Sequence, residues 1–155
     1  MKPLEGWTTD ILGSPYEAIR LQLAPDDDGA PIEAVLVRRT EGNRKAVLHV
    51  HGFADYFFQT AYADHWLARG YDFYALDLRR YGRALLEGQY ANYTDDLGEY
   101  YEELDIAFAE VSREHGHVVL SGHSTGGLTV SLWANDRGHD IAGVVLNAPW
   151  LDMHG

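Results

Sequence analysis

The first half of the hydrophobic pattern predicts a hairpin. Two apolar, partly β-branched runs, residues 18–23 and 32–39, flank the turn sequence Asp26-Asp27-Asp28-Gly29. Runs of this type separated by a Gly- and Asp-rich turn are typical of antiparallel strands. We expect the acidic turn to be a solvated loop, because the neighbouring sequence offers no further oxygen ligands for calcium.

From residue 46 onward, strand-like and helix-like patterns alternate. Apolar runs predict buried strands at residues 46–50, 72–78, 118–121 and 141–146. Helical spacing predicts helices at residues 57–68 and 125–136, and a long helix capped by Thr94 or Asp95. The apolar stripe of the long helix is expected to pack in the core; it consists of Leu97, Tyr101, Leu104, Phe108 and Val111. The prediction is an α/β fold with six strands and three main helices, in which a mostly parallel sheet has antiparallel lead-in strands and helices on both faces.

Composition narrows the class of protein. The 155 residues fit one domain with a core, and 24 Asp and Glu against 12 Lys and Arg predict a negative surface that disfavours nucleic acid. The chain has no cysteine, which excludes disulfides and thiolate zinc sites. The N-terminus does not resemble a signal peptide, and no apolar run approaches the ~18 residues of a membrane span. We therefore expect a cytoplasmic protein without an integral membrane segment.

A G-x-S-x-G motif, Gly122-His123-Ser124-Thr125-Gly126, joins a predicted strand to a predicted helix. In this context the serine sits on a sharp turn that exposes its Oγ as a nucleophile. The glycines give the turn room, and the free N–H groups at the start of the helix face a developing oxyanion. A phosphate-binding loop is excluded because no Gly-Lys pair follows, and the dinucleotide motif G-x-G is absent. The motif predicts a serine hydrolase that uses an acyl-enzyme intermediate.

A second segment, His51-Gly52-Phe53-Ala54-Asp55-Tyr56, follows the strand at residues 46–50. With this His-Gly pair, the chain resembles the α/β-hydrolase family, in particular its monoacylglycerol lipase, lysophospholipase and serine aminopeptidase-like group. The resemblance implies that the backbone N–H groups of Phe53 and Thr125 form the oxyanion hole. We expect His51, Gly52, Tyr56 and His123 to contact substrate.

Two further segments match the family pattern incompletely. Asp77, Arg79 and Gly82 match the family's D-x-R-G-x-G-x-S loop, whereas Arg80 replaces a glycine and Ala84 replaces the serine. In the family this loop is structural. The segment that begins at Asn147 resembles the one that precedes the family's lid.

The remaining members of the catalytic triad are not evident in the chain. In this fold the order is Ser, then Asp or Glu, then His. Asp152 is a weak candidate for the acid, since it follows a strand, whereas His139 and His154 are poorly placed for the base. The resemblance implies that the acid, the histidine, the lid and the C-terminal strands lie beyond Gly155. Residues 1–155 would then be the N-terminal part of an α/β-hydrolase domain, truncated after the sixth strand.

The predicted strand at residues 141–146 is apolar on both faces, yet it would lie at a sheet edge. An unprotected apolar edge strand promotes aggregation, so a complementing C-terminal segment or chain is expected to cover it. His49 and His51 alternate on one strand, but without a carboxylate at ligand spacing we interpret them as one core histidine and one that anchors a loop. No metal or cofactor is expected.

The predicted activity is hydrolysis of carboxylic esters, with a lipid-like small-molecule substrate such as a monoacylglycerol or lysophospholipid. Three alternatives remain open. The same scaffold supports amidases and peptidases. The chain could also be a non-catalytic binding module with this fold, or one half of a two-chain enzyme.

Overall fold

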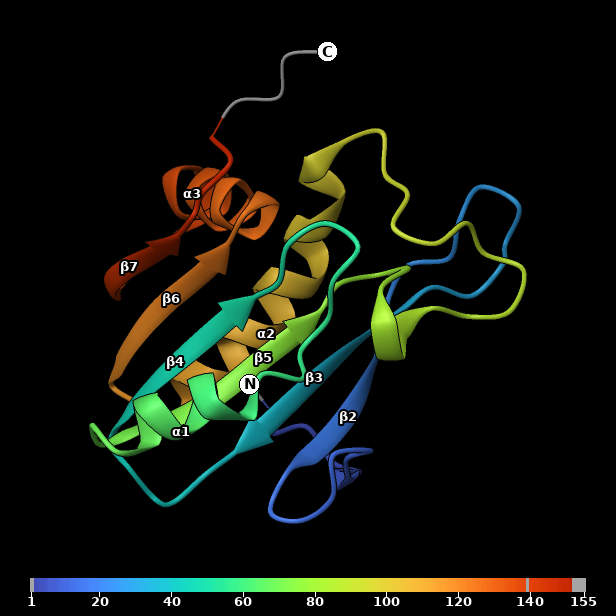
Figure 1. Ribbon diagram of the computed structural model, residues 1–155. Coiled ribbons are helices and arrows are strands. Elements are labelled where there is room, and N and C mark those ends of the chain that lie inside the picture. Colours follow the sequence, from blue (N-terminus) through green and yellow to red (C-terminus); the bar gives the residue numbers. More distant parts are fainter. Residues whose placement is uncertain (1, 139, 152–155) are drawn as a thin grey trace.

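A computed structural model describes residues 2–138 and 140–151. In this part of the chain the backbone forms one seven-stranded sheet with the order β1-β2-β3-β5-β4-β6-β7 (Figure 1). The strands are β1 (Thr8–Thr9), β2 (Glu17–Gln22), β3 (Glu33–Arg39), β4 (Lys45–Val50), β5 (Tyr71–Asp77), β6 (His117–His123) and β7 (Ile141–Asn147). The helices are α1 (Thr60–Leu67), α2 (Tyr101–Glu114) and α3 (Thr125–Arg137), with short 3₁₀ turns η1 (Gly82–Ala84) and η2 (Leu97–Tyr100).

The sheet combines the two predicted pairing modes. The strands β1, β2, β3 and β5 pair antiparallel in that order, whereas β4 pairs parallel with β5 and β6, and β6 pairs parallel with β7. The arrowheads of β4, β5 and β6 therefore point to the same end of the molecule (Figure 1). Ligands bind at this end of open α/β sheets, because the loops that follow parallel strands meet there. The fold class predicted from the sequence is confirmed, and the short strand β1 is an addition to it.

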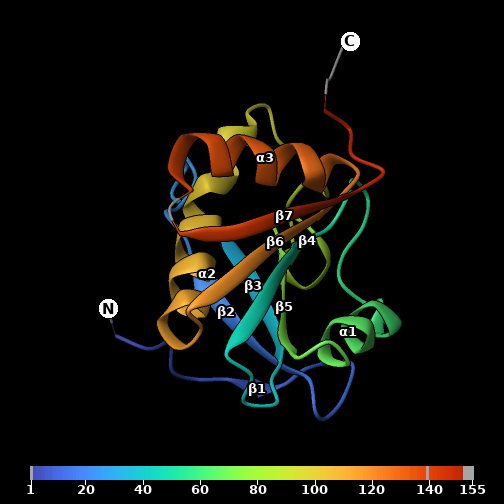
Figure 2. The ribbon, with the colours of Figure 1, turned by 90° about the vertical axis from the view of Figure 1, so that its left-hand side faces the viewer.

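Helices cover both faces of the sheet (Figure 2). The helices α2 and α3 pack on one face through apolar residues such as Leu104 and Trp133, and these contact strand residues including Leu48 and Leu120. The helix α1 lies on the opposite face, where Ala63 and Leu67 join the cluster that contains Val47 and Phe73. The alternation of side chains along each strand separates the two cores. None of the helices in the described residues is long and apolar enough to cross a membrane.

Two predicted helix starts are wrong by a few residues. Helix α1 begins at Thr60 instead of residue 57, because Phe57 is fully buried and its N–H donates to Asp77 Oδ1 (3.0 Å). The long helix is preceded by the 3₁₀ turn η2, which Asp96 caps by accepting a hydrogen bond from Gly98 N (2.8 Å). Neither Thr94 nor Asp95 is the cap, since the chain enters the helix through this tighter turn.

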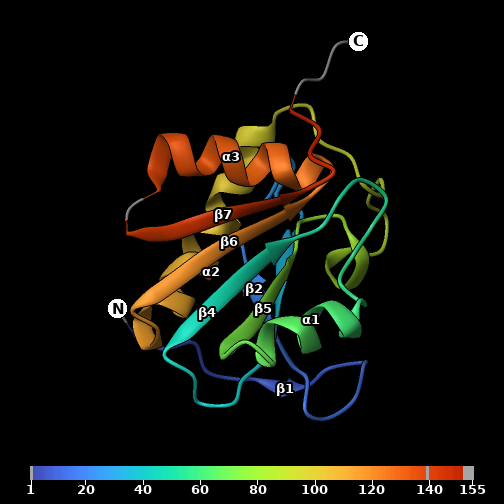
Figure 3. The same ribbon diagram turned by 60° about the vertical axis from the view of Figure 1, so that its left-hand side comes forward.

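Strand β7 forms one edge of the sheet in the described part of the chain (Figure 3). Its position at an edge matches the prediction, but its burial does not. Val144 and Val145, which point to opposite faces, are each 42% exposed. The strand is therefore apolar and half-covered, with α3 packed along one side of it (Figure 3).

Candidate active site

Ser124 occupies a sharp turn between β6 and α3. Its backbone has φ +54° and ψ −120°, a conformation that costs a non-glycine residue about 1–3 kcal/mol and persists only where the surroundings enforce it. The Ser124 N–H donates to Asn147 O (3.0 Å), and the Ser124 carbonyl accepts from Gly127 N (2.9 Å) and Trp150 N (3.0 Å). The first turn of α3 therefore holds the Ser124 turn on one side, and the end of β7 with the residues after it holds the other side.

Close backbone contacts explain the glycines around Ser124. A Cβ atom on Gly126 would collide with the carbonyl oxygens of Val50 and His51, and one on Gly122 would lie 2.7 Å from Gly126 O. A Cβ atom on Gly52 would lie 3.1 Å from Ser124 Cβ. The His-Gly segment and the serine turn thus touch through their backbones, and larger residues would separate them.

Ser124 lines a pocket of about 420 Å³ at the carboxyl ends of the strands. The pocket is lined by His49, Gly52, Phe53, Ala54, Asp55, Gln59, Tyr62, His123, Ser124 and Asn147. The Ser124 side chain is partly exposed, and among the described residues its Oγ has no hydrogen-bond partner. A hydroxyl in this position is free to meet a ligand.

The two predicted oxyanion donors adjoin this pocket. Phe53 lines it, and Thr125 follows Ser124 as the first residue of α3. The N–H of a first helical residue has no acceptor within its own helix. Outside helices and strands, neither N–H donates a backbone hydrogen bond in the described part of the chain. Both groups therefore remain available beside Ser124.

His51, which was expected to contact substrate, does not line this pocket. The residue is 2% exposed, its Nδ1 donates to Gly52 O (2.8 Å), and its Nε2 accepts from Leu78 N (3.1 Å). Burial lowers the pKa of His51, which keeps the ring neutral, as these two bonds require. His51 thus anchors the loop that carries Gly52 and Phe53, as the alternative interpretation of this residue predicts.

His49 is buried, as predicted for a core histidine, but it also lines the pocket. Its Nδ1 lies 2.9 Å from Ser121 Oγ, which lies 2.6 Å from Tyr62 OH. Burial lowers the pKa of His49 to about 3. Within residues 2–138 and 140–151, neither His49 nor His51 belongs to a group of three or more potential metal ligands.

The other expected contact residues differ in position. Gly52 and His123 line the pocket. Tyr56 does not; it is 40% exposed and packs against Phe58, with 5.1 Å between the ring centroids. Asp152 lies outside the described residues, as do His139 and His154, so the structure does not place a triad acid or base among them.

Sequence reasoning missed four polar residues of the pocket: Asp55, Gln59, Tyr62 and Asn147. Asp55 accepts from Gly52 N (3.2 Å) and from Gln59 Nε2 (3.4 Å), so it also supports the loop. Asn147 is the last residue of β7 and Asp55 lies in the loop that follows β4, so their places near strand ends could have indicated them. Tyr62 belongs to the apolar pattern of a predicted helix, and this pattern indicates a core residue and not a polar contact in a pocket.

Beside this pocket, residues 77–84 form a loop whose charges are paired. Asp77 accepts from Phe57 N and from both Arg83 N (3.1 Å) and Arg83 Nη1 (3.0 Å). Arg83 also binds Asp10 through two bonds of 2.8 Å. A Cβ atom on Gly82 would collide with Tyr56, which explains the glycine.

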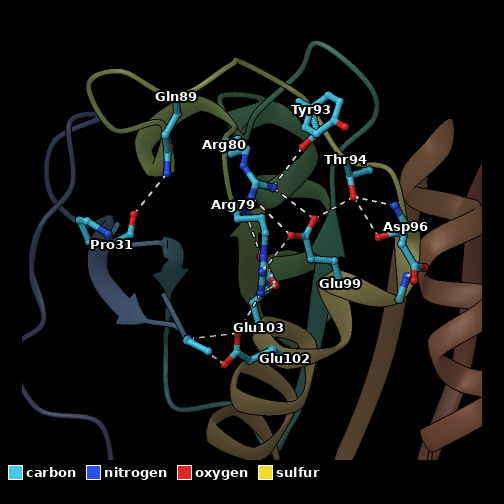
Figure 4. Close-up of polar contacts among 12 residues, drawn as sticks. Pro31, Arg79, Arg80, Gln89, Tyr93, Thr94, Asp96, Glu99, Glu102 and Glu103 are labelled. Carbon is cyan, nitrogen blue, oxygen red and sulfur yellow. Dashed lines mark hydrogen bonds and ion pairs between the residues drawn. The ribbon is translucent and has the colours of Figure 1, made fainter. Parts of the chain in front are cut away.

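Arg79 reaches from this loop to helix α2 (Figure 4). Its guanidinium binds Glu103 (2.8 Å), which is fully buried, and Glu102 (2.9 Å). Arg79 N also donates to Glu103 Oε2 (2.9 Å). Hereafter, residues 77–84 with Glu103 are called the charged loop.

The two departures from the family's loop pattern have structural explanations. Arg80 has φ +66°, a conformation that favours the glycine of the family, and its guanidinium binds Glu99 (3.2 Å) and Tyr93 O (Figure 4). Ala84 is fully buried in the apolar cluster on the α1 side, where a serine hydroxyl would need a partner. The loop keeps its role as a structural support with different residues.

The sheet order, the turn at Ser124 and the adjoining loop define an α/β-hydrolase fold. A family described as serine aminopeptidase, S33, matches residues 41–155, and the chain belongs to this family. A comparison with curated proteins finds no match.

Solved structures support the same fold. A probable hydrolytic enzyme from Pseudomonas aeruginosa is 17% identical with a TM-score of 0.70, and the match covers 94% of this chain and 44% of that one. An esterase from Pyrococcus furiosus is 18% identical with a TM-score of 0.66, and the match covers 96% of this chain and 55% of that one. A CIB-like hydrolase from Thermoplasma acidophilum is 21% identical with a TM-score of 0.59, and the match covers 85% of this chain and 64% of that one. The chain thus spans less than two thirds of the length of these structures.

Proposed function

We propose that the protein is a serine hydrolase of carboxylic esters with Ser124 as its nucleophile. The observation that carries the proposal is the backbone of Ser124, which is held at φ +54° beside an open pocket while its hydroxyl has no partner in the described residues. A strained turn maintained by three backbone hydrogen bonds is typical of an active site, where it holds the nucleophile in position.

The chemistry follows from this geometry. Ser124 Oγ would attack the ester carbonyl while a general base takes its proton, and the N–H groups of Phe53 and Thr125 would stabilise the oxyanion. Collapse of the tetrahedral intermediate expels the alcohol, which takes up a proton, and leaves an acyl-enzyme. Water then releases the acid by the same route. The base and its acidic partner would come from residues outside the described part, on this chain or a complementing one.

Exposed apolar side chains near the pocket support a lipid-like substrate. Phe53, Tyr56 and Phe58 are 61%, 40% and 50% exposed on the loop that follows β4. Trp150 and Leu151 are 54% and 56% exposed next to the turn that binds the Ser124 carbonyl. Exposed apolar side chains on the segments that adjoin the pocket suit an ester with one acyl chain, such as a monoacylglycerol or a lysophospholipid.

Amide hydrolysis is the second candidate, because the matching family is described as serine aminopeptidase. Both reactions use the same nucleophile and oxyanion donors, and they differ in the leaving group. The scaffold alone does not separate them.

Hydrolysis of paired p-nitrophenyl esters and p-nitroanilides by the full-length protein tests the proposal. We expect turnover of the esters, with faster hydrolysis of medium-length than of acetyl chains, and a loss of at least about 10⁴-fold in kcat for Ser124→Ala. Faster anilide hydrolysis would favour the peptidase. Ester turnover that survives Ser124→Ala would refute the assignment of the nucleophile.

A further inference from the structure

A polar chain of three side chains lies behind the pocket. His49 on β4 and Ser121 on β6 are direct partners in the parallel ladder, so their side chains project to the same face of the sheet. His49 Nδ1 lies 2.9 Å from Ser121 Oγ, and Tyr62 OH from helix α1 lies 2.6 Å from the same oxygen. Ser121 is 1% exposed, so it does not compete with Ser124 for substrate.

This chain controls the remaining nitrogen of His49. If Tyr62 donates to Ser121, Ser121 donates to His49 Nδ1, and Nε2 then carries the proton as a donor. If the bonds run the other way, Nδ1 carries the proton and Nε2 is an acceptor. In both arrangements the Ser121 hydroxyl donates one hydrogen bond and accepts one. Neither needs a charged imidazole, because burial lowers the pKa of His49 to about 3 and keeps the ring neutral.

The Nε2 atom is the free end of this chain. Among the described residues it has no hydrogen-bond partner. It is also not one of the fully buried polar atoms without a partner, so it is accessible from the pocket. His49 lines the pocket together with Asp55, Gln59 and Asn147. A ligand group in this pocket therefore meets a neutral imidazole whose Nε2 can donate or accept.

A hydroxyl group fits this end better than a charged group. A hydroxyl both donates and accepts, so it matches either arrangement of protons, whereas a carboxylate only accepts and an ammonium group only donates. Asp55 in the same lining disfavours an anionic group.

We propose that His49 is a specificity-determining residue whose Nε2 hydrogen-bonds a hydroxyl group of the substrate, with Ser121 and Tyr62 as the positioning residues that orient its ring. The proposal rests on the proposed esterase function and adds to it that the substrate carries a hydroxyl near the scissile bond. A methyl group in place of that hydroxyl would leave the buried imidazole nitrogen without a partner.

Two pairs of esters that exchange a hydroxyl for a methyl group test this proposal with the full-length protein. In 2-hydroxyethyl butanoate and propyl butanoate the exchange is in the alcohol, and in ethyl 3-hydroxybutanoate and ethyl 3-methylbutanoate it is in the acyl part. We expect one pair to show a preference in kcat/KM of about tenfold for the hydroxyl ester, expressed mainly in KM. The pair that responds identifies the side of the ester that occupies the pocket.

Variants assign the preference to His49. His49→Phe is expected to lower the ratio to about one, and His49→Gln, whose amide can replace the Nε2 contact, to restore part of it. Tyr62→Phe keeps the ring but removes one end of the chain, and it is expected to lower the ratio about threefold; this variant carries the test if His49→Phe does not fold. His65→Gln on the exposed side of α1 is the control and should keep both the wild-type ratio and rates.

Equal rates within both pairs, or a preference that keeps its full wild-type size in His49→Phe or in Tyr62→Phe, would overturn the role of His49 while hydrolysis by Ser124 stands. Failure of the wild-type protein to hydrolyse any of the four esters, together with no reaction of Ser124 with a fluorophosphonate, would overturn the proposed function and this inference together.

Discussion

The turn at Ser124 follows β6 and the charged loop follows β5, on either side of β4, and their polar groups differ in how they are bonded. In the charged loop, Asp77 and Arg79 are buried and bonded on several sides. At the turn, the Ser124 hydroxyl has no partner in the described residues and its backbone is strained. Both loops carry reactive residue types, so residue type alone does not identify the active one.

The comparison shows that residues with a structural role have all their polar groups bonded within the protein, whereas the candidate nucleophile does not. A buried charge that is fully bonded has no capacity left for a ligand, and its removal leaves the partner charge unpaired. A hydroxyl that is held in place by its backbone, with its side chain free, keeps its hydrogen-bonding capacity for substrate. Changes in the two regions should therefore produce different defects.

The largest effect is expected from Gly126→Ala. The added Cβ would collide with the carbonyl oxygens of Val50 and His51, which are backbone atoms of a central strand and its loop and have no room to move. We expect a loss of more than about 4 kcal/mol in the free energy of unfolding, measured by urea denaturation. Gly116→Ala is the control, since its Cβ would meet nothing within 4 Å. A folded Gly126→Ala protein of wild-type stability would show that the two loops do not touch as described.

Glu103→Ala tests the charged loop. Arg79 would lose its buried partner and its N–H would lose its acceptor, although Glu102 and Glu99 would still bind the guanidinium. We expect a loss of about 3 kcal/mol in urea denaturation, with Ser124 still reactive in the protein that remains folded. Glu114→Ala, at the exposed end of the same helix, should change stability by less than about 0.5 kcal/mol. Loss of reactivity in a folded Glu103→Ala protein would contradict the supporting role of this loop.

A smaller effect is expected from acid. The unfolded His49 binds a proton below about pH 6.5, whereas the folded residue stays neutral to about pH 3. The unfolded state therefore binds more protons in this window, and stability falls as pH is lowered through it. At pH 5 this residue should account for about 2 kcal/mol of the loss relative to pH 8. Urea denaturation at both pH values should show a smaller loss for His49→Gln, and an unchanged loss for His65→Gln; equal losses in wild type and His49→Gln would contradict the buried neutral ring.

Local patterns in the sequence predicted most of the fold. Apolar runs placed β2 to β7 to within one or two residues, and the G-x-S-x-G motif placed the turn at Ser124. Strand length and turn geometry depend on adjacent residues, so these features are visible without the fold. The starts of α1 and α2 were missed, because the contacts of Phe57 with Asp77 and the 3₁₀ turn at Asp96 depend on distant or competing bonds.

The candidate site could be predicted only in part. The sequence indicated Ser124, Gly52 and Phe53, which lie in local motifs. It left two roles open for His51, substrate contact and loop anchoring, and it did not indicate that His49, a predicted core residue, reaches the pocket. It also gave no sign of the pair of Arg79 with Glu103, which are far apart in the chain. Such contacts arise when separate strands and helices pack, so they follow from the fold and not from a pattern along the chain.

Labelling with a fluorophosphonate, followed by mass spectrometry of the modified peptide, tests the central claim most directly. We predict that the full-length protein is modified at Ser124 alone, that Ser124→Ala abolishes labelling, and that Ser131→Ala on the same helix leaves it unchanged. Modification of another serine, or labelling that persists in Ser124→Ala, would contradict the claim that the strained turn presents the reactive hydroxyl.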